Sequence, residues 1–304
     1  MYNALIIGAG QIAGGYDSPQ DESVLTHAHA YSKHKGFNLL GFYDVDFSKA
    51  SEMAKKWGVK AFKSLDEVGS VDVISICSPD SFHLASLKET LKLNPKLIFL
   101  EKPLSDNLYE AKEILEISKK IPILVNYSRR FVPEIQELAK TAKGGAFGEF
   151  LYGVGYYGKG FIHNGSHMTN LLDLLVGKIT KVDIVHEFED FYPNDKTKTA
   201  ILSFDCNKFT MKGIECRNYT IFELDLFFEK SRVRILDSGN KLEIYEVKES
   251  GNYAGYKNLI LKEVINTELN LAMLHAVENI YRHLENNEPL KSTVEKAFEA
   301  INYG

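Results

Sequence analysis

The sequence predicts an α/β protein with two domains: a doubly wound parallel sheet in residues 1–125 and an α+β domain in residues 126–304. Three observations predict this fold class. The chain opens with an apolar run that breaks into a glycine-rich turn. Strand-like runs then alternate with helical patterns as far as residue 125, which is typical of a parallel sheet with crossover helices. From residue 178 to 247, β-rich runs alternate with short polar turns, as in a large, open, mostly antiparallel sheet.

Hydrophobic periodicity defines the elements of the first domain. Helices are predicted where apolar residues recur at helical spacing, with Ser48 and Ser81 as candidate caps; these stretches are 47–57, 82–93 and 108–119. The strand candidates between them are 4–7, 38–43, 71–75, 97–100 and 121–125.

The second domain is predicted as a meander with helices on one face of its sheet. Polar turns are expected at 205–208 and 237–240, and two closing helices at 269–285 and 292–300. The strand candidates are 181–188, 199–204, 209–214, 221–228, 233–236 and 242–247.

The glycine-rich turn has the pattern Gly8-x-Gly10-x-x-Ala13, with Gln11 and Ile12 between. Gly8 would permit the tight turn, Gly10 would let the backbone approach a pyrophosphate, and Ala13 would allow close packing of helix on strand. Phosphates would then lie over the N-terminus of the following helix. The turn therefore predicts a Rossmann dinucleotide-binding domain, although glycine-rich turns are common in α/β proteins.

Asp44 ends the second predicted strand, where a carboxylate can bind the ribose hydroxyls and repel a 2′-phosphate. It lies further from Gly8 than the roughly 20 residues of the standard unit, and the polar stretch 16–26 accounts for the excess as an inserted loop. No Arg or Lys follows directly, so NAD is favoured over NADP. The alternative is an aspartate that only caps the next turn.

Composition excludes several other classes of protein. The net charge of −5 provides no basic field for nucleic acid. The cysteines at 77, 206 and 216 have no disulfide or metal-site spacing, so no metal is expected. No apolar run reaches the roughly 18 residues of a membrane span. The sequence therefore predicts a cytoplasmic protein without nucleic-acid or membrane partners.

Several motifs of this chain occur together in one known family. They are Gly8-Ala-Gly10, Asp44, the turn 77–83, Glu101-Lys-Pro103, the segment 126–130 and Gly165-Ser-His167. In this order and spacing the chain resembles the glucose-fructose oxidoreductase and inositol dehydrogenase family, Gfo/Idh/MocA. The resemblance implies a Rossmann domain followed by an open mixed sheet that carries the substrate site. It also implies an oligomer, expected as a homodimer or homotetramer.

The resemblance implies that Lys102 exchanges a proton with the substrate hydroxyl or carbonyl. Alcohol oxidation by hydride transfer needs such a group, and a partly desolvated lysine can have its pKa brought toward neutrality. The Lys102–Pro103 bond is a candidate cis peptide. The alternative for Lys102 is a surface lysine at a strand end. His167 matches the family's histidine, which positions the substrate oxygen.

The chain departs from the family beside His167. The family carries an aspartate four residues before this histidine and a second acid three residues after it, where this chain has His163 and Asn170. His163 could relay a proton, and Asn170 could orient His167; the alternative for His163 is a structural loop histidine. Asp173 lies off the same helical face as His167.

Other candidates follow from position. Ser78 and Pro79 are expected beside the nicotinamide ribose, with Glu101 bonded to that ribose or to Lys102. His83 closes the pocket or caps a helix. Tyr127 and Arg130 are candidate substrate or cofactor contacts.

Two groups of rings leave open alternatives. Tyr152, Tyr156, Tyr157 and Phe161 form either an aromatic wall on which a sugar stacks or a strand packed on one face. His27 and His29 lack metal-ligand partners and are interpreted as surface or capping histidines.

The sequence thus predicts an NAD-dependent oxidoreductase that transfers a hydride between nicotinamide and a hydroxyl-bearing carbon of a carbohydrate. Nucleotide-linked or surface-polysaccharide sugars are the favoured substrates. Two alternatives remain: a lyase or epimerase that recycles its NAD without net redox change, and a catalytically inactive NAD-binding regulatory protein.

Overall fold

The computed structural model describes residues 1–205 and 207–303, and its internal contacts form two compact units. Unit 1 contains residues 1–131 and 270–302, and unit 2 contains residues 132–269 together with Tyr303. Each unit is described by itself. Cys206, which is part of the predicted turn at 205–208, lies outside the described residues.

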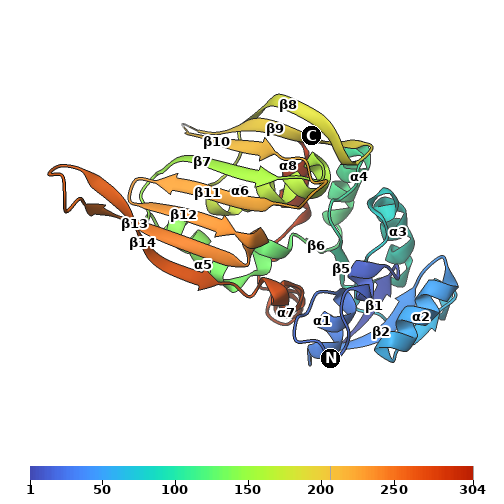
Figure 1. The fold of residues 1–304 in the computed structure, drawn as a ribbon. Helices are drawn as coiled ribbons and strands as arrows, with labels where there is room; N and C mark the ends of the chain where they lie inside the picture. The colour runs from blue at the N-terminus through green and yellow to red at the C-terminus, as the bar shows by residue number, and fades with distance from the viewer. Residues whose placement is uncertain (206, 304) are drawn as a thin grey trace. The chain divides into compact units, whose positions relative to one another are not determined.

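Unit 1 is built on a parallel sheet whose described strands run in the order β3-β2-β1-β4-β5-β6 (Figure 1). Neighbouring strands are parallel throughout, which confirms the predicted doubly wound sheet. Only the short β3 has no counterpart among the predicted strands. The strands are β1 (Tyr2–Ile7), β2 (Phe37–Tyr43), β3 (Lys60–Phe62), β4 (Val73–Ile76), β5 (Leu97–Leu100) and β6 (Ile123–Val125).

The strand order reverses at β1, so right-handed connections place α1 and α2 on one face and α3 and α4 on the other. The described helices of this half are α1 (His27–Lys33), α2 (Phe47–Trp57), α3 (His83–Thr90) and α4 (Leu108–Ser118). Short helical turns are η1 (Gln11–Gly15), η2 (Leu65–Glu67), η3 (Asp80–Phe82), η4 (Leu91–Leu93) and η5 (Ser128–Phe131).

The predicted caps Ser48 and Ser81 are wrong. Asp46 caps α2, because its carboxylate accepts a hydrogen bond from the Ser48 amide. Helix α3 begins after Phe82, within a helical turn that already satisfies the first amides.

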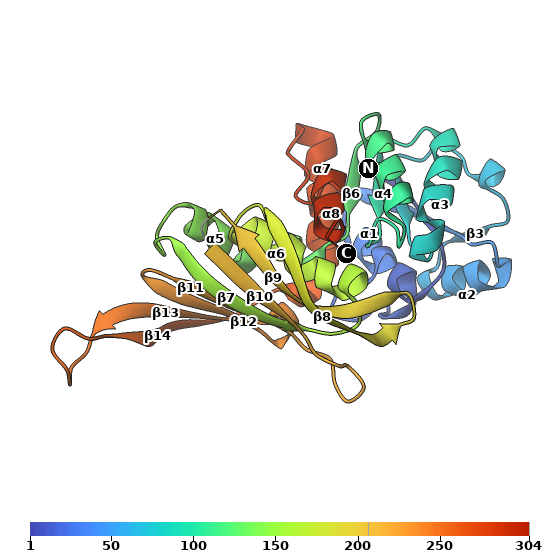
Figure 2. The ribbon, with the colours of Figure 1, turned by 90° about the horizontal axis from the view of Figure 1, so that it is seen from above.

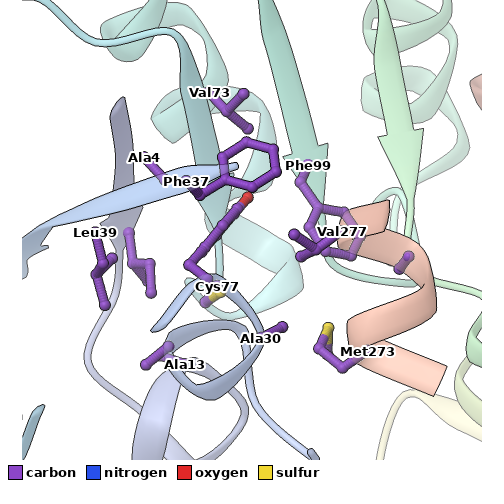
Figure 3. Packing of buried hydrophobic residues seen from close by; sticks show 14 of the residues in the cluster. Ala4, Ala13, Ala30, Phe37, Leu39, Val73, Cys77, Phe99, Met273 and Val277 are labelled. Atoms are coloured by element: carbon purple, nitrogen blue, oxygen red, sulfur yellow. The ribbon is translucent and has the colours of Figure 1, made fainter. Parts of the chain in front are cut away.

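The last two helices belong to the core of unit 1. Helix α7 (Ala272–Asn286) packs against α1 and η5, and α8 (Val294–Ile301) packs against α4 and β6. Figure 3 shows Met273 and Val277 of α7 in one apolar cluster with Phe99 of the sheet. The predicted boundary assigns these helices to the second domain; that division at residue 125 stays a prediction.

Unit 2 contains a sheet of described strands in the order β14-β13-β12-β11-β7-β10-β9-β8 (Figures 1 and 2). The pair β7 and β10 is parallel, and the other pairs of described strands are antiparallel, which confirms the predicted mostly antiparallel sheet. The strands are β7 (Phe150–Tyr157), β8 (Lys181–Tyr192), β9 (Asp195–Phe204), β10 (Asn207–Gly213), β11 (Phe222–Phe228), β12 (Ser231–Leu236), β13 (Lys241–Glu249) and β14 (Lys257–Asn266).

Helices α5 (Pro133–Lys143) and α6 (Ser166–Leu175) lie against one face of this sheet (Figure 2). Burial alternates along β10, β11 and β12, as expected for a sheet with one covered face. Gly155 of β7 permits close packing, because a Cβ there would stand 2.6 Å from Met168 Sδ of α6. The short turns of unit 2 are η6 (Phe161–Gly165) and η7 (Asp237–Gly239), and η8 (Leu269–Leu271) precedes α7.

Candidate functional site

The glycine turn follows β1 directly at the carboxyl edge of the parallel sheet. Gly8 has a φ of +93°, and a Cβ there would stand 2.8 Å from the Cys77 carbonyl, so only glycine lets β1 and the end of β4 approach so closely. A Cβ at Gly10 would meet no described atom within 4 Å. This open space beside the backbone is what a pyrophosphate requires, so the turn fits a dinucleotide. Ala13 is buried against the sheet, as predicted.

The helix expected directly after this turn is interrupted. Residues Gln11–Gly15 form only a five-residue π-helical turn, loop 16–26 follows, and α1 starts at His27. The inserted loop is therefore confirmed, and the helical segment that directly follows the glycine turn is this single short turn. The Gly14 carbonyl accepts hydrogen bonds from Trp57 and Lys56 of α2 instead of from a following helical turn. Two consecutive glycines also favour helix poorly.

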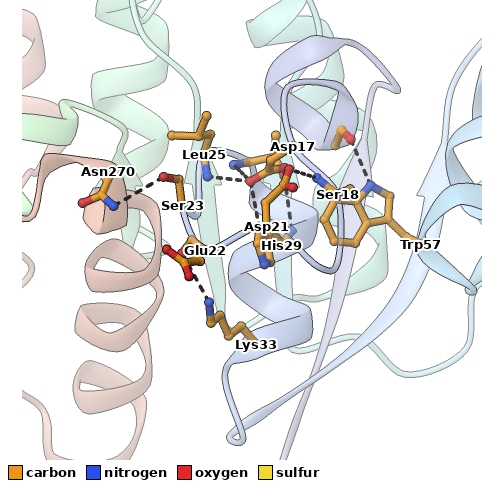
Figure 4. A network of polar contacts seen from close by, with 12 residues as sticks. Asp17, Ser18, Asp21, Glu22, Ser23, Leu25, His29, Lys33, Trp57 and Asn270 are labelled. Carbon is orange, nitrogen blue, oxygen red and sulfur yellow. Dashed lines mark hydrogen bonds and ion pairs between the residues drawn. The ribbon is translucent and has the colours of Figure 1, made fainter.

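The buried carboxylate of Asp17 holds loop 16–26 in place (Figure 4). It accepts hydrogen bonds from the Leu25 amide at 2.6 Å, from the Thr26 amide and hydroxyl, and from His29 Nδ1 at 2.9 Å. His29 is buried, so its interpretation as a surface or capping histidine is wrong. Thr26, not a histidine, caps α1.

Asp44 stands beside the glycine turn. Its Oδ2 accepts a hydrogen bond from the Ala9 amide at 2.8 Å, and its Oδ1 accepts one from the Asp46 amide at 2.9 Å. Each carboxylate oxygen has further lone pairs for a ribose hydroxyl. Lys56, a cation on α2, donates to the carbonyls of Gly14 and Gly15 at 2.8 and 3.0 Å.

His83 links the turn after β4 to the segment after β5. Its Nδ1 lies 2.9 Å from the Pro103 carbonyl oxygen, and its Nε2 lies 3.0 Å from that of Ser78. Burial lowers the pKa of His83 despite its hydrogen bonds to the Leu104 and Ser78 carbonyls, so the neutral ring donates to one acceptor at a time. The Lys102–Pro103 bond is cis, as the sequence allowed. Pro79 precedes η3 at the same turn.

Glu101 is a buried carboxylate at the end of β5, with 7% of its surface exposed. Its Oε1 accepts hydrogen bonds from His27 Nε2 at 2.8 Å and from Asn126 Nδ2 at 2.6 Å. Its Oε2 accepts a longer one, 3.3 Å, from the Lys102 amide. Burial raises the pKa of Glu101, but the hydrogen bond and charge of His27, followed by Asn126 and Lys102, outweigh it and lower the pKa. Glu101 is thus an ionised group that accepts a hydrogen bond from the backbone amide of the candidate lysine, Lys102.

His27 extends this contact into the core of unit 1. Its Nδ1 lies 2.9 Å from Ser75 Oγ, which lies 2.9 Å from the Tyr31 hydroxyl. Since an ionised carboxylate only accepts, His27 donates to Glu101 through Nε2. All of these side chains are buried, so the interpretation of His27 as a surface or capping histidine is wrong. Its ring also packs on Phe99, with centroids 4.4 Å apart.

Tyr127 and Arg130 follow β6 and are buried within unit 1. The Arg130 guanidinium approaches the Lys291 carbonyl at 3.5 Å. Their roles as substrate or cofactor contacts stay predictions.

In unit 2, His163 lies in η6, immediately before α6. Its Nδ1 is 2.8 Å from Oδ2 of Asp195, a buried carboxylate at the start of β9. The ring stacks on Tyr192 of β8, with centroids 3.7 Å apart and planes at 13°. The structure therefore pairs His163, the histidine found where the family carries an aspartate, with the acid Asp195.

His167 and Asn170 lie on the first turns of α6, one helical turn apart. Asn170 is buried, whereas His167 is half-buried and meets Phe222 edge to face at 6.4 Å. Their roles toward a substrate stay predictions.

The four rings of the predicted aromatic wall do not share one face. Tyr157 and Phe161 are buried, and the Tyr157 hydroxyl donates to the Lys198 carbonyl at 2.7 Å. Tyr152 and Tyr156, on the opposite face of β7, are 42% and 39% exposed. A role of Tyr157 toward a substrate stays a prediction, with its hydroxyl already bonded to the backbone.

Sequence reasoning missed Asp195 and the part played by His27. Asp195 follows a Pro-Asn pair between two polar stretches, which is typical of an exposed turn. No local signal links either residue to its distant partner.

In the described residues, 1–205 and 207–303, no group of three or more His, Cys, Asp or Glu side chains could hold a metal ion. None of the helices in this part of the chain is long and apolar enough to cross a membrane.

Known proteins resemble this chain in sequence. Residues 2–127 match the model of a family described as "Oxidoreductase family, NAD-binding Rossmann fold". The inositol 2-dehydrogenase of Rhizobium meliloti is 28% identical over 127 residues, which are 40% of this chain and 38% of that protein. The D-glucoside 3-dehydrogenase of Escherichia coli is 27% identical over 150 residues, 47% of this chain and 40% of that protein. The chain thus matches about two fifths of the length of these curated relatives.

Among solved structures, a UDP-N-acetylglucosamine 3-dehydrogenase from Acidithiobacillus ferrooxidans has the same fold. It superposes with a TM-score of 0.79 at 18% identity, covering 99% of this chain and 94% of that one. Both units are therefore present in the fold of that protein.

Proposed function

We propose that the chain is an NAD-dependent oxidoreductase of the Gfo/Idh/MocA family that acts on a carbohydrate, since residues 2–127 match the model of that family. The observation that carries the proposal is the open glycine turn, with the Asp44 carboxylate bonded to the Ala9 amide beside it. The relatives named as inositol and glucoside dehydrogenases support a polyol or sugar as the substrate class.

The nicotinamide, when bound, supplies hydride transfer to and from a hydroxyl-bearing carbon. The residues of the chain bind, orient and move the proton. Gly8 permits the tight turn, Gly10 leaves room for the pyrophosphate, and Asp44 binds the ribose. Lys102 handles the hydroxyl proton, its backbone amide held by ionised Glu101, and His167 holds the substrate oxygen.

We infer NAD rather than NADP. The Asp44 carboxylate would repel a 2′-phosphate. The ammonium of Lys56 is bonded to two carbonyls of the neighbouring turn, which supports the same preference.

For the finer substrate class, we infer a nucleotide-linked or surface-polysaccharide sugar. The departure at His163 and Asn170 from the family's acids supports a substrate other than a simple sugar alcohol. We also infer a homodimer or homotetramer, supported by the exposed apolar side chains of β14, among them Ile260 and Leu261.

The proposal is tested first by binding. Purified protein is titrated with NADH and NADPH while nicotinamide fluorescence is followed. We expect preference for NADH, and in Asp44→Ala about 10- to 100-fold weaker NADH binding, since a hydrogen bond to a charged group contributes about 1.5–3 kcal/mol. Asp46→Ala is the matched control, because Asp46 caps α2 and should leave the preference unchanged.

A panel of sugars and sugar nucleotides is then incubated with NAD. Accumulation of NADH supports net dehydrogenation, and product without NADH supports recycling of the cofactor. Binding of neither dinucleotide would overturn the proposed function.

A further inference from the structure

We propose that Lys56 and Trp57, at the C-terminal end of α2, are positioning residues for the dinucleotide. They hold the backbone carbonyls that end the glycine turn, and so keep the turn in the form that accepts a pyrophosphate. The inference rests on the proposed function and deepens it, because it assigns to α2 the support that a longer helix after the turn would otherwise give.

The segment that follows Gly10 has little support of its own. Its helical part, Gln11–Gly15, has five residues, and a helix this short is marginal in water even in a favourable sequence. Two of these residues are glycines, which lose more conformational freedom on folding than any other residue. The hydrogen bond from the Gly14 amide to the Gly10 carbonyl is also long, at 3.4 Å. The shape of the turn therefore depends on contacts from outside it.

Helix α2 supplies these contacts. The Lys56 ammonium donates to the carbonyls of Gly14 and Gly15 at 2.8 and 3.0 Å. The Trp57 indole N–H donates to the Gly14 carbonyl at 3.0 Å. Carbonyls at the end of a helix have no partner within it and need one from elsewhere. Here an ammonium and an indole take that place, and the hydrogen bonds from the ammonium are strengthened by its charge.

The backbone of the turn also lies directly on the indole. A Cβ at Gly14 would stand 2.5 Å from Trp57 Nε1 and 2.9 Å from Met53 Sδ, so only glycine permits this approach. Trp57 is 7% exposed, and the Lys56 ammonium lies 5.9 Å from the centre of its ring. The two side chains thus form one anchor on one side of the turn.

The same indole touches the loop that follows the turn (Figure 4). The rings of His29 and Trp57 have centroids 5.5 Å apart, and His29 Nδ1 lies 2.9 Å from the Asp17 carboxylate, which holds loop 16–26. The chain is therefore anchored on both sides of Gly15.

The consequence for the cofactor is a turn that is already in its binding form. A Cβ at Gly10 would meet no described atom within 4 Å, and this open side of the backbone is where a pyrophosphate approaches. The apparent affinity falls in proportion to the fraction of molecules in that form. Lys56 and Trp57 bind the carbonyl end of the turn, so their loss should weaken NADH and NADPH binding by the same factor. Asp44, in contrast, decides the preference.

The first test is titration of the full chain with NADH and NADPH, followed by nicotinamide fluorescence. Lys56→Met keeps a side chain of similar length and removes the donor, and we expect about 3- to 10-fold weaker binding of both dinucleotides. The matched control is Lys55→Met, which removes the same charge from a neighbouring exposed position of α2. We expect its affinities to stay within about 2-fold of the wild type, since salt screens an exposed charge.

Three outcomes of this titration would overturn the proposal. One is an unchanged affinity in Lys56→Met. Another is an equal loss in Lys56→Met and Lys55→Met, which would mean that surface charge alone attracts the dinucleotide. The third is a loss for one dinucleotide only, which would mean that Lys56 acts at the ribose.

The second test uses the emission of Trp57, the single tryptophan of the sequence. In cofactor-free Lys56→Met we expect emission at longer wavelength than in the wild type, because a released turn uncovers the indole to water. Saturating oxidised NAD should return the emission to the wild-type position, since the dinucleotide selects the held form of the turn. Wild-type emission in cofactor-free Lys56→Met would contradict the proposal.

Trp57→Phe tests the indole donor. An aromatic ring stays against Gly14 and the N–H is lost, so both dinucleotides should bind about 3- to 10-fold more weakly. Because Trp57 is buried, urea unfolding first establishes that the variant is folded. Wild-type affinity in the folded variant would overturn the role of Trp57, and the Lys56 series, made at an exposed position, tests the anchor independently.

The proposed function and the positioning role fail in different ways. If the wild type binds neither dinucleotide, the proposed function fails and the positioning role fails with it. If the wild type binds NADH and Lys56→Met binds it equally well, the proposed function stands and the positioning role alone fails.

Discussion

Two histidine–carboxylate pairs in unit 1 differ chiefly in burial. His27 and Glu101 meet at 2.8 Å with side chains 0% and 9% exposed, whereas His34 and Glu278 meet at 2.7 Å with side chains 12% and 37% exposed. Removing one partner of a buried pair leaves an uncompensated charge and costs about 3–5 kcal/mol. An exposed pair contributes about 0–1 kcal/mol. Burial, not distance, separates their energies.

His27→Leu should therefore lower the free energy of unfolding by about 3–5 kcal/mol at pH 7. The wild-type pKa of Glu101 is lowered, so its contribution is present above the unfolded pKa and lost as pH falls through the folded one. Without His27, burial remains and raises that pKa. The variant's penalty should then shrink from pH 7 to pH 4.5, because Glu101 takes up a proton. Urea unfolding at several pH values measures this.

His34→Leu is the matched control. We expect it to cost about 1 kcal/mol or less, since Glu278 keeps access to water. A penalty for His27→Leu that equals this value, or that does not change with pH, would contradict a buried charge at Glu101.

Among the elements, loop 16–26 depends on one carboxylate. Asp17→Ala would leave the amides of Leu25 and Thr26 and the His29 ring without their acceptor. We expect a loss of about 3 kcal/mol, because unsatisfied buried polar groups cost about 1–3 kcal/mol each and the loop can open to water. Hydrogen exchange should then accelerate at residues 25 and 26.

Asp21→Ala is the comparison for this loop. Asp21 is exposed and accepts a hydrogen bond from the Ser18 amide (Figure 4), so its loss should leave the stability close to that of the wild type. Equal effects of the two variants would mean that Asp17 does not hold the loop.

Periodicity predicted the elements whose pattern is strong. Helix α2 and strand β5 have the predicted bounds, since their apolar spacing is regular. Strand β14 was not predicted, because it is almost entirely exposed and lysine and glutamate interrupt its apolar residues. Strand β3 has three residues, too few for a period to be detected.

The candidate site was predictable where a motif is contiguous in the chain. Gly8 and Asp44 directly follow strands, and Lys102 lies two residues after one, so parallel topology alone brings them to one edge of the sheet. Asp195 reaches His163 only through the register of the β8–β9 hairpin. Hairpin register is a property of tertiary packing, and no single segment of sequence contains it.

For the whole molecule, the order of the chain and the order of packing differ. Ile280 of α7 is fully buried in the core of unit 1, far in sequence from the strands that surround it. Ile280→Ala should cost about 2–5 kcal/mol. We expect hydrogen-exchange protection to fall in β1 and β2, which belong to the same core.

Leu224→Ala is the counterpart in unit 2. Leu224 lies buried on β11, so protection should fall in the eight-stranded sheet instead. Loss of protection in that sheet in Ile280→Ala would contradict the assignment of α7 to unit 1.

The return of α7 to the first core has a consequence for synthesis on the ribosome. The parallel sheet leaves the ribosome first, but the apolar surface that receives Met273 and Val277 stays uncovered until residues 132–269 have been translated. At about 5–20 residues per second, this wait is about 7–28 s. Throughout that interval unit 1 is an incomplete fold, and the sheet of unit 2 forms as an insertion within it. A nascent chain stalled before residue 270 should therefore recruit chaperones through unit 1, because helix α7 has not yet been synthesised.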